Sequence, residues 1–168
     1  MMYRKITING KEVRLTNEQL KMLGIEVENK KNPFERVNHD ADDKYYYIRV
    51  SGDVADYRDV NDNADRLLYE TSNYFNDKDF AEQVALHQLL YRKLLKFAYD
   101  NNCEDNQEWD CENGHYHVYY SHAYKIFKTE LNYEGQHPGV YFTSQEAAKR
   151  AIKEVIEPFI KEHPEFVW

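Results

Sequence analysis

The sequence is poor in the residues on which several familiar kinds of functional site depend. It has six glycines and two cysteines among 168 residues, and no stretch approaches the roughly 20 apolar residues that a membrane-spanning helix needs. The glycines form neither a phosphate-binding loop nor a dinucleotide-binding fingerprint, and no serine lies in a nucleophile elbow. These absences argue against a nucleotide-hydrolysing enzyme, a dinucleotide-dependent enzyme or a serine hydrolase. We therefore expect a protein that is not an enzyme.

The few cysteines belong to one cluster with histidines, which comprises Cys103, Cys111, His115, His117 and His122. Structural zinc sites usually bring paired ligands together through a gap of about two to four residues, whereas seven residues separate the two cysteines. The loop 59–70 partly matches a calcium-binding loop, but Ala64 replaces its turn glycine and Arg66 adds a positive charge. We therefore expect reduced cysteines, a solvated acidic turn, and neither a metal nor a cofactor.

Basic residues are also in the minority. Thirty acidic side chains stand against twenty-two basic ones, so the net charge is −8. A field of this sign repels nucleic acid and anionic membranes, and we expect neither as a direct partner. The amino-terminal stretch MMYRKITING lacks the apolar region of a signal peptide, which favours a cytoplasmic protein.

The longest segment with unbroken helical periodicity is 76–102. Its apolar residues recur at spacings of three and four, on one helical face: Phe80, Val84, His87, Tyr91, Leu94 and Ala98. Further leucines widen that face, so we expect the helix to be buried on much of its circumference and to contact more than one layer. Asn76 or Asp77 can cap its start. On this helix, His87 is predicted to be a core histidine with a satisfied hydrogen bond.

The amino-terminal residues predict a small ββα module. Asn9-Gly10 is a strong hairpin signal between two short strands, and Thr16 and Gln19 have the spacing of a capping box before a helix that Gly24 ends. The polar segment 28–33 has the composition of a linker. The predicted division is therefore a module at 1–28 and a main domain at 33–168.

The main domain contains two passages with the order strand, strand, strand, helix. The first has strands at 44–50, 54–60 and within 67–75; the second has strands at 116–120, 125–131 and 139–142 and a helix from 145 to about 161. Thr143 and Glu146 could form a capping box before that helix, and the apolar tail 166–168 should pack. The predicted fold class is α+β: an antiparallel sheet from two β-β-β-α-like units with two helices on one face, plus the ββα module.

Two acidic runs form the candidate binding surface. Its residues are Asp40, Asp42, Asp43, Glu104, Asp105, Glu108 and Trp109. Such runs are usually solvated loops. The sharper interpretation is a surface that presents carboxylates where a nucleic-acid-binding protein expects phosphates. A tryptophan among carboxylates is then either a core anchor or an interface anchor.

Several sequence phrases together resemble small accessory proteins of phages and prophages of Gram-positive bacteria. They are ITINGKEVRLTNEQLKMLGI, NPFERV followed by YYYI, and the carboxy-terminal PFIKEHPEFVW. The resemblance implies a phage accessory protein, a class that includes inhibitors of host defence, and it supplies no functional residue.

The leading functional hypothesis joins this resemblance to the acidic surface. It is a non-enzymatic binding protein that blocks a bacterial defence component, such as a CRISPR effector or a nucleotide-signalling defence, and whose partner carries a basic nucleic-acid-binding surface. The first alternative is a sponge that sequesters a small nucleotide signal in an aromatic-lined pocket. The second is a hydrolase with unrecognised catalytic residues.

Overall fold

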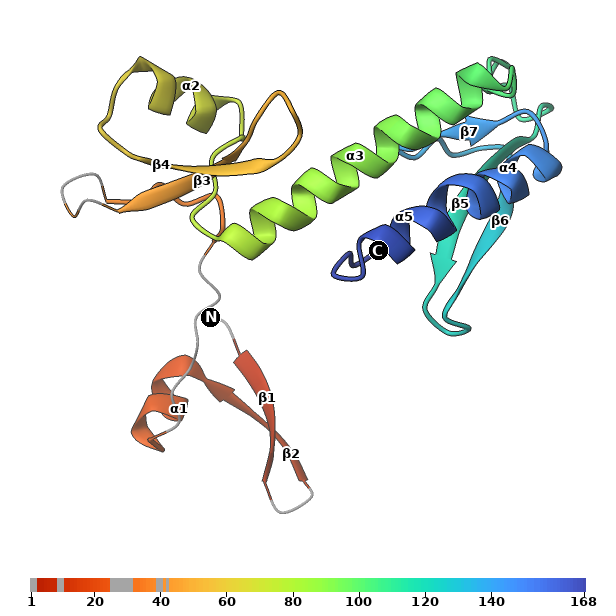
Figure 1. The fold of residues 1–168 in the computed structure, drawn as a ribbon. Coiled ribbons are helices and arrows are strands. Elements are labelled where there is room, and N and C mark those ends of the chain that lie inside the picture. Colours follow the sequence, from red (N-terminus) through yellow and green to blue (C-terminus); the bar gives the residue numbers. More distant parts are fainter. Residues whose placement is uncertain (1–2, 9–10, 25–31, 39–40, 42) are drawn as a thin grey trace.

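A computed structural model describes residues 3–8, 11–24, 32–38, 41 and 43–168. Its helices and antiparallel strands confirm the α+β class. Figure 1 shows an amino-terminal module and two lobes, with the long helix α3 (Lys78–Asp100) running between the lobes. We call residues 32–76 the small lobe and residues 103–168 the large lobe.

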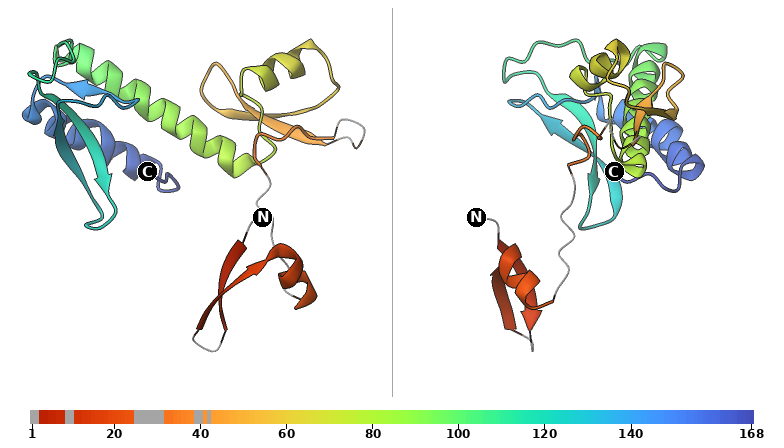
Figure 2. Two further views of the ribbon diagram at one scale, coloured as in Figure 1. Left: turned by 180° about the vertical axis from the view of Figure 1, so that it is seen from behind. Right: turned by 90° about the vertical axis from the view of Figure 1, so that its left-hand side faces the viewer.

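The amino-terminal module contains the three predicted elements, β1 (Tyr3–Ile8), β2 (Lys11–Thr16) and α1 (Asn17–Met22). The strands pair in antiparallel register, whereas Asn9 and Gly10 lie outside the described residues. The Thr16 hydroxyl accepts from the backbone N–H of Gln19, and the Gln19 side chain accepts from the backbone N–H of Thr16, which confirms the capping box. The module is drawn apart from both lobes, and its treatment as a separate domain stays a prediction (Figures 1 and 2).

The small lobe is built on a hairpin of β3 (Lys44–Ile48) and β4 (Val54–Arg58), as predicted. Tyr46 on the outer side of β3 exchanges backbone hydrogen bonds with Phe75, so the chain returns to this hairpin just before α3 begins. Gly52 turns the hairpin with φ +92, a conformation that residues with a side chain rarely adopt.

The short strand predicted within 67–75 is reduced to the bridge between Phe75 and Tyr46, and the first half of that segment belongs to a helix that was not predicted, α2 (Asn63–Glu70). The cause is a capping box at the start of that helix. The Asp62 carboxylate accepts from the backbone N–H groups of Ala64 and Asp65, and the Asp65 side chain accepts from the backbone N–H of Asp62. Residues that looked like a polar loop thus nucleate a helix.

The prediction of a solvated acidic turn is wrong as well, because Asp59 and Asp65 are 2% and 0% exposed. Asp59 accepts two hydrogen bonds from Arg36 and one from the Tyr74 hydroxyl. Burial opposes its ionisation, but these donors outweigh burial and lower the pKa of Asp59 to about 2. Asp65 accepts from the Tyr45 hydroxyl at 2.8 Å. The two carboxylates therefore form the polar centre of the small lobe.

Helix α3 contacts more than one layer, as predicted, because it packs against both lobes. Asp77 caps it by accepting from the backbone N–H of Phe80 at 3.0 Å. Its first half contacts β3 and β4, and its second half contributes to the core of the large lobe. The buried residues are Ala81, Ala85, Leu90, Leu94, Phe97 and Ala98. Tyr91 and Leu95 are 47% and 37% exposed, so part of the helix surface faces solvent.

The large lobe has its own sheet, with β5 (His115–Ser121) between β6 (Ile126–Asn132) and β7 (Tyr141–Phe142). The predicted single sheet is therefore wrong, because the strands of the two lobes form separate sheets. The 23 residues of α3 span about 34 Å, which keeps the hairpins at opposite ends of the helix (Figure 2). Helices α3 and α4 (Gln145–Ala151) share a core with one face of the large-lobe sheet.

The carboxy-terminal helix is interrupted rather than uniform. After α4 the chain makes a π-helical turn, η2 (Ile152–Ile156), and continues as α5 (Glu157–Glu162). Pro158 has no N–H and its ring would collide with a carbonyl one turn earlier, and the wider π turn relieves that conflict. The cap of α4 is Ser144, whose hydroxyl accepts from a backbone N–H at 3.1 Å. Thr143, the predicted cap, instead donates its N–H to the Cys103 carbonyl.

The apolar tail packs, as predicted. Phe166 is 9% exposed and meets the Phe159 ring edge-on at 5.3 Å. Trp168 meets the Phe127 ring at 5.0 Å. The tail therefore closes the core of the large lobe against β6.

Candidate functional site

The predicted acidic residues do not gather into one described surface. Asp40 and Asp42 lie outside the described residues, Asp43 and Glu108 are exposed, and Glu104 is half-buried. The Asp105 side chain is 2% exposed. Only part of the predicted carboxylate surface is therefore available to a partner.

Asp105 is withdrawn from the surface because it pairs with a buried histidine. Its Oδ2 lies 2.6 Å from Nδ1 of His115, whose side chain is 0% exposed. His115 begins β5, and the backbone N–H of Asp105 donates to the carbonyl of Tyr141 on β7. Pairing along the sheet edge thus brings the acid and the histidine together.

Trp109 covers this pair and acts as an anchor of the lobe. Its ring stacks on His115 with the centroids 3.6 Å apart and the planes 12° apart. It also meets the Tyr141 ring edge-on at 5.1 Å. An acid and histidine pair resembles the base of a hydrolase, but Trp109 covers His115 here, so we assign the pair a structural role.

The cysteines do not join the histidines. Cys103 is buried and Cys111 is exposed, and burial raises the pKa of the Cys103 thiol. Among the described residues, no three histidine, cysteine, aspartate or glutamate side chains converge in a way that could hold a metal ion.

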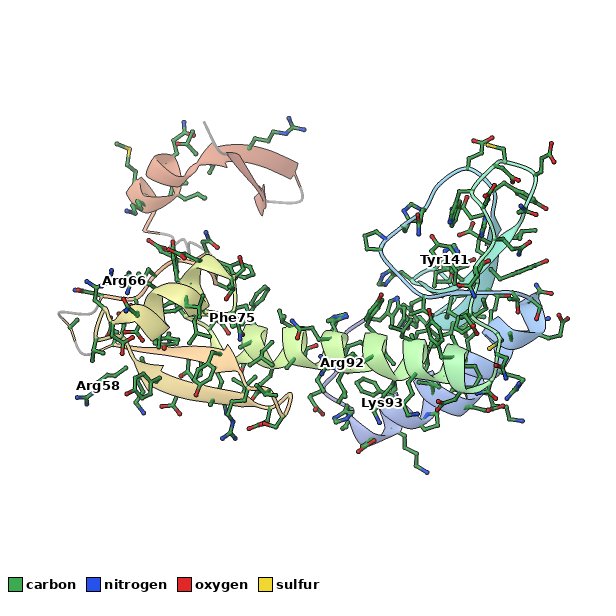
Figure 3. The ribbon with its side chains drawn as sticks, turned by 90° about the horizontal axis from the view of Figure 1, so that it is seen from above. Arg58, Arg66, Phe75, Arg92, Lys93 and Tyr141 are labelled. Atoms are coloured by element: carbon green, nitrogen blue, oxygen red, sulfur yellow. The ribbon has the colours of Figure 1, made fainter. Side chains whose placement is uncertain are left out.

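The hollow that we take as the candidate site lies beside β5 in the large lobe and has a volume of about 410 Å³. Its walls come from α3, β5, the segment before β7 and the end of the chain. They are His87, Leu90, Tyr91, Leu94, His117, Val118, Tyr119, His137, Pro138, Gly139, Val140, Tyr141, Phe142 and Trp168. Figure 3 shows Tyr141 among the many ring side chains of this lobe. We call this hollow the aromatic pocket.

The aromatic pocket exists because β7 stops after two residues. The register pairs His117 with Tyr141, so continuing it would bring Pro138 alongside β5. Proline has no N–H to donate to a strand ladder. Instead, the backbone N–H of His137 donates to the Tyr141 hydroxyl at 2.8 Å, which folds this segment back on itself. The departing chain leaves a space beside the remaining residues of β5.

The electrostatic character of the aromatic pocket is close to neutral. None of the described residues that line it is a lysine, arginine, aspartate or glutamate. Burial lowers the pKa of His117, and the nearby Glu130, whose Oε2 is 3.6 Å from His117 Nε2, only partly offsets this effect. His117 is therefore neutral at neutral pH. Such walls favour an uncharged ring over an anion.

Sequence reasoning did not find this pocket. His87 was predicted to be a core histidine, but it is exposed at the pocket and its ring packs on Phe166 at 4.7 Å. The histidine alternation on β5 and the apolar tail were visible in the sequence. Nothing in the sequence indicated that both lie beside the same face of α3, because that juxtaposition arises from packing.

Comparison of the chain with protein-family models, curated proteins and solved structures finds no match. The resemblance to phage accessory proteins therefore stays a prediction. None of the helices in the described ranges is long and apolar enough to span a membrane.

Proposed function

We propose that the protein is a non-enzymatic binding protein that holds a small, uncharged, planar aromatic ligand, such as the base of a nucleotide signal, in the aromatic pocket. One observation carries this proposal. The pocket of about 410 Å³ is walled by aromatic, imidazole and aliphatic side chains, with no formally charged residue among those described. Ligand pockets for small molecules commonly measure about 300 to 1,000 Å³.

The walls suit a base better than a phosphate. Stacking of a base on an aromatic side chain contributes about 1 to 3 kcal/mol. A phosphate needs cationic or N–H donors, and the net charge of −8 repels it from a distance. A bound nucleotide would therefore insert its base and leave its phosphates at the mouth.

A binding role also fits the placement of the acid and histidine pair. His115 is buried under Trp109 and is not among the residues that line the aromatic pocket. A ligand confined to the pocket walls would therefore not touch that imidazole. Sequestration of the ligand, rather than its conversion, is the function that follows.

The two tryptophans provide a direct test. Trp168 lines the aromatic pocket, whereas Trp109 stacks on His115 away from it. In the Trp109→Phe variant, Trp168 is the only fluorescent tryptophan. We expect nucleosides to quench it saturably, and the matching nucleoside monophosphates to bind no more tightly. The Trp168→Phe variant, which retains Trp109, should show no saturable change.

A tyrosine pair serves as the matched control for affinity. Tyr119→Ala removes a ring from the pocket wall and should weaken binding by about tenfold. Tyr57→Ala removes a ring that is 54% exposed in the small lobe and should leave binding unchanged. No saturable quenching of Trp168 by any nucleoside, or equal weakening by both variants, would contradict the proposal.

The acidic surface supports a second candidate function, inhibition of a host defence protein that has a basic nucleic-acid-binding surface. The observation that favours it is the loop after Asp105, where Glu108, Asp110 and Glu112 are all exposed. Replacing Asp43, Glu108 and Glu112 by their amides leaves the buried Asp105 in place. Association of this variant with a purified CRISPR effector should be slower than that of the parent at low salt, and the difference should shrink as salt screens the charges.

A further inference from the structure

The outer edge of β6 carries an unused set of backbone hydrogen-bonding groups. The strand order β6-β5-β7 places β6 at the edge of the sheet, and no strand in the described part of the chain pairs with its outer side. Ile126 and Leu131 on this strand are 50% and 36% exposed. An edge of seven residues with exposed apolar side chains is a template for pairing with another strand.

The first question is whether β6 could pair with β6 of a second copy. Two identical strands related by a two-fold axis perpendicular to the sheet run antiparallel, and each residue keeps its face of the sheet. Residues opposite each other in an antiparallel pair share a face of the sheet. The axis must therefore pass midway between the two copies of one residue, which we call the centre. Of the possible centres, only Thr129 leaves all seven residues of Ile126–Asn132 paired.

The same register is also the one that charge favours. With Thr129 at the centre, Lys128 of each copy lies opposite Glu130 of the other, so the contact contains two opposite-charge pairs. Moving the centre to Lys128 or to Glu130 would place like charges directly opposite each other. The number of paired residues and the charge pattern are independent criteria, and both select the register centred on Thr129.

We infer that two copies of this chain pair through β6 around Thr129, which makes one sheet with the order β7-β5-β6-β6-β5-β7. On the helical face, Phe127 of each copy lies opposite Leu131 of the other, and this covers the exposed part of Leu131. On the opposite face lie the two pairs of Lys128 and Glu130. The same face also places Ile126 of each copy opposite Asn132 of the other, so the charge complementarity of that face lies in its two central pairs.

The charged side chains already have neighbours within one copy, and these neighbours leave them available. Lys128 Nζ lies 3.8 Å from the centroid of the Tyr124 ring, which is 69% exposed. Glu130 lies near His117, and its side chain is 60% exposed. Lys128 is half-buried beside an exposed ring and Glu130 is exposed, so both side chains can turn to partners across the new strand pair.

Variants that reverse the charge of Lys128 or Glu130 test the register directly. Sedimentation equilibrium of the full chain should give a species of twice the single-chain mass of 20.2 kDa. Lys128→Glu replaces both attractive pairs by repulsive ones, and so does Glu130→Lys. Each should raise the dissociation constant of the dimer by at least about tenfold. The double exchange restores opposite charges and should restore the dimer. Thermal melts of all three variants check that they are folded.

A cysteine at the axis gives an independent readout. In a Cys111→Ser background, Thr129→Cys should form a disulfide between copies under air, because residue 129 lies opposite itself within the Cα separation of about 4.4 to 6.8 Å that a disulfide needs. Lys128→Cys in the same background should not cross-link, because it is offset from its equivalent. A single-chain mass at every concentration overturns the inference. So does a dimer that tolerates both single exchanges, or equal cross-linking of the two cysteine variants.

None of the residues that line the aromatic pocket belongs to β6, although Glu130 lies beside the pocket residue His117. Lys128→Glu, which leaves Glu130 in place, should therefore bind nucleosides like the parent. Failure of the pocket proposal would leave the oligomeric state unchanged, and failure to dimerise would leave Trp168 quenching unchanged.

Discussion

The two lobes at the ends of α3 are held together in different ways. The small lobe has a two-stranded sheet, which alone is too small to be stable, and its centre is the pair of buried carboxylates of Asp59 and Asp65 with their tyrosine and arginine donors. The large lobe has an apolar core that joins α3, α4, α5 and one face of a three-stranded sheet.

The lobes also differ in whether their buried polar side-chain atoms have hydrogen-bond partners. Among the described residues, the buried side-chain atoms that lack a hydrogen-bond partner are Glu104 Oε2, His115 Nε2 and His117 Nδ1, all in the large lobe. A satisfied polar network specifies a structure, whereas unsatisfied buried groups gather where structure is strained or functional. Of these three atoms, only His117 Nδ1 belongs to a residue that lines the aromatic pocket.

The largest expected effect is a loss of apolar packing in the large lobe. Leu90 is 3% exposed and belongs to its core. Leu90→Ala should lower the free energy of unfolding by about 2 to 5 kcal/mol, measured by chemical denaturation. Leu95→Ala, on the same helix at 37% exposure, should cost much less. Hydrogen exchange should accelerate mainly in β5 and β7; equal acceleration in the small lobe would show that the lobes unfold as one unit.

The next effect tests the polar centre of the small lobe. Asp59→Ala leaves the Tyr74 hydroxyl and the Arg36 guanidinium without their acceptor. The Arg36 side chain is 28% exposed and can reach water, so we expect a loss of about 2 to 3 kcal/mol. Exchange should accelerate in β3, β4 and α2 but not in β5. Unchanged exchange in β3 would remove the distinction between the lobes.

Acid should weaken the small lobe through the same carboxylate. The pKa of Asp59 is about 2 in the folded protein, against an ordinary value of 3.8. A depressed folded pKa contributes stability above the unfolded pKa, and this stability, about 2 kcal/mol, is lost as pH falls from about 4 to about 2. Asp59→Asn should flatten this part of the stability curve. A parent and variant with parallel curves below pH 4 would contradict the assignment.

The smallest expected effect comes from the amino-terminal module. The described hydrogen bonds of β1, β2 and α1 stay within the module. Deleting residues 1–31 should leave a cooperative unfolding transition and change the stability of the two lobes by no more than about 0.5 kcal/mol. If the transition is lost, the module completes one of the lobes, and the comparison must include a third part.

Local sequence patterns predicted the local structure of this chain correctly in most places. The spacing of apolar residues in 76–102 predicted α3 and its contacts with more than one layer, and Asp77 was among its predicted caps. The strands predicted at 44–50, 54–60, 116–120 and 125–131 are those of the β3–β4 and β5–β6 hairpins. These features depend on neighbours within a few residues along the chain, and such contacts are encoded in spacing and capping chemistry.

Tertiary structure decided what those patterns left open. The length of α3 separated the two hairpins into two sheets, and the burial of Asp59 and Asp65 turned an apparently wet loop into a polar core. The aromatic pocket joins α3, β5 and Trp168, and the pair of Asp105 and His115 depends on strand pairing around Tyr141. Each of these arrangements brings together side chains from separate elements. These side chains are not spaced at a helical or strand repeat in the sequence. Only the packing of the whole chain could therefore determine which of them meet.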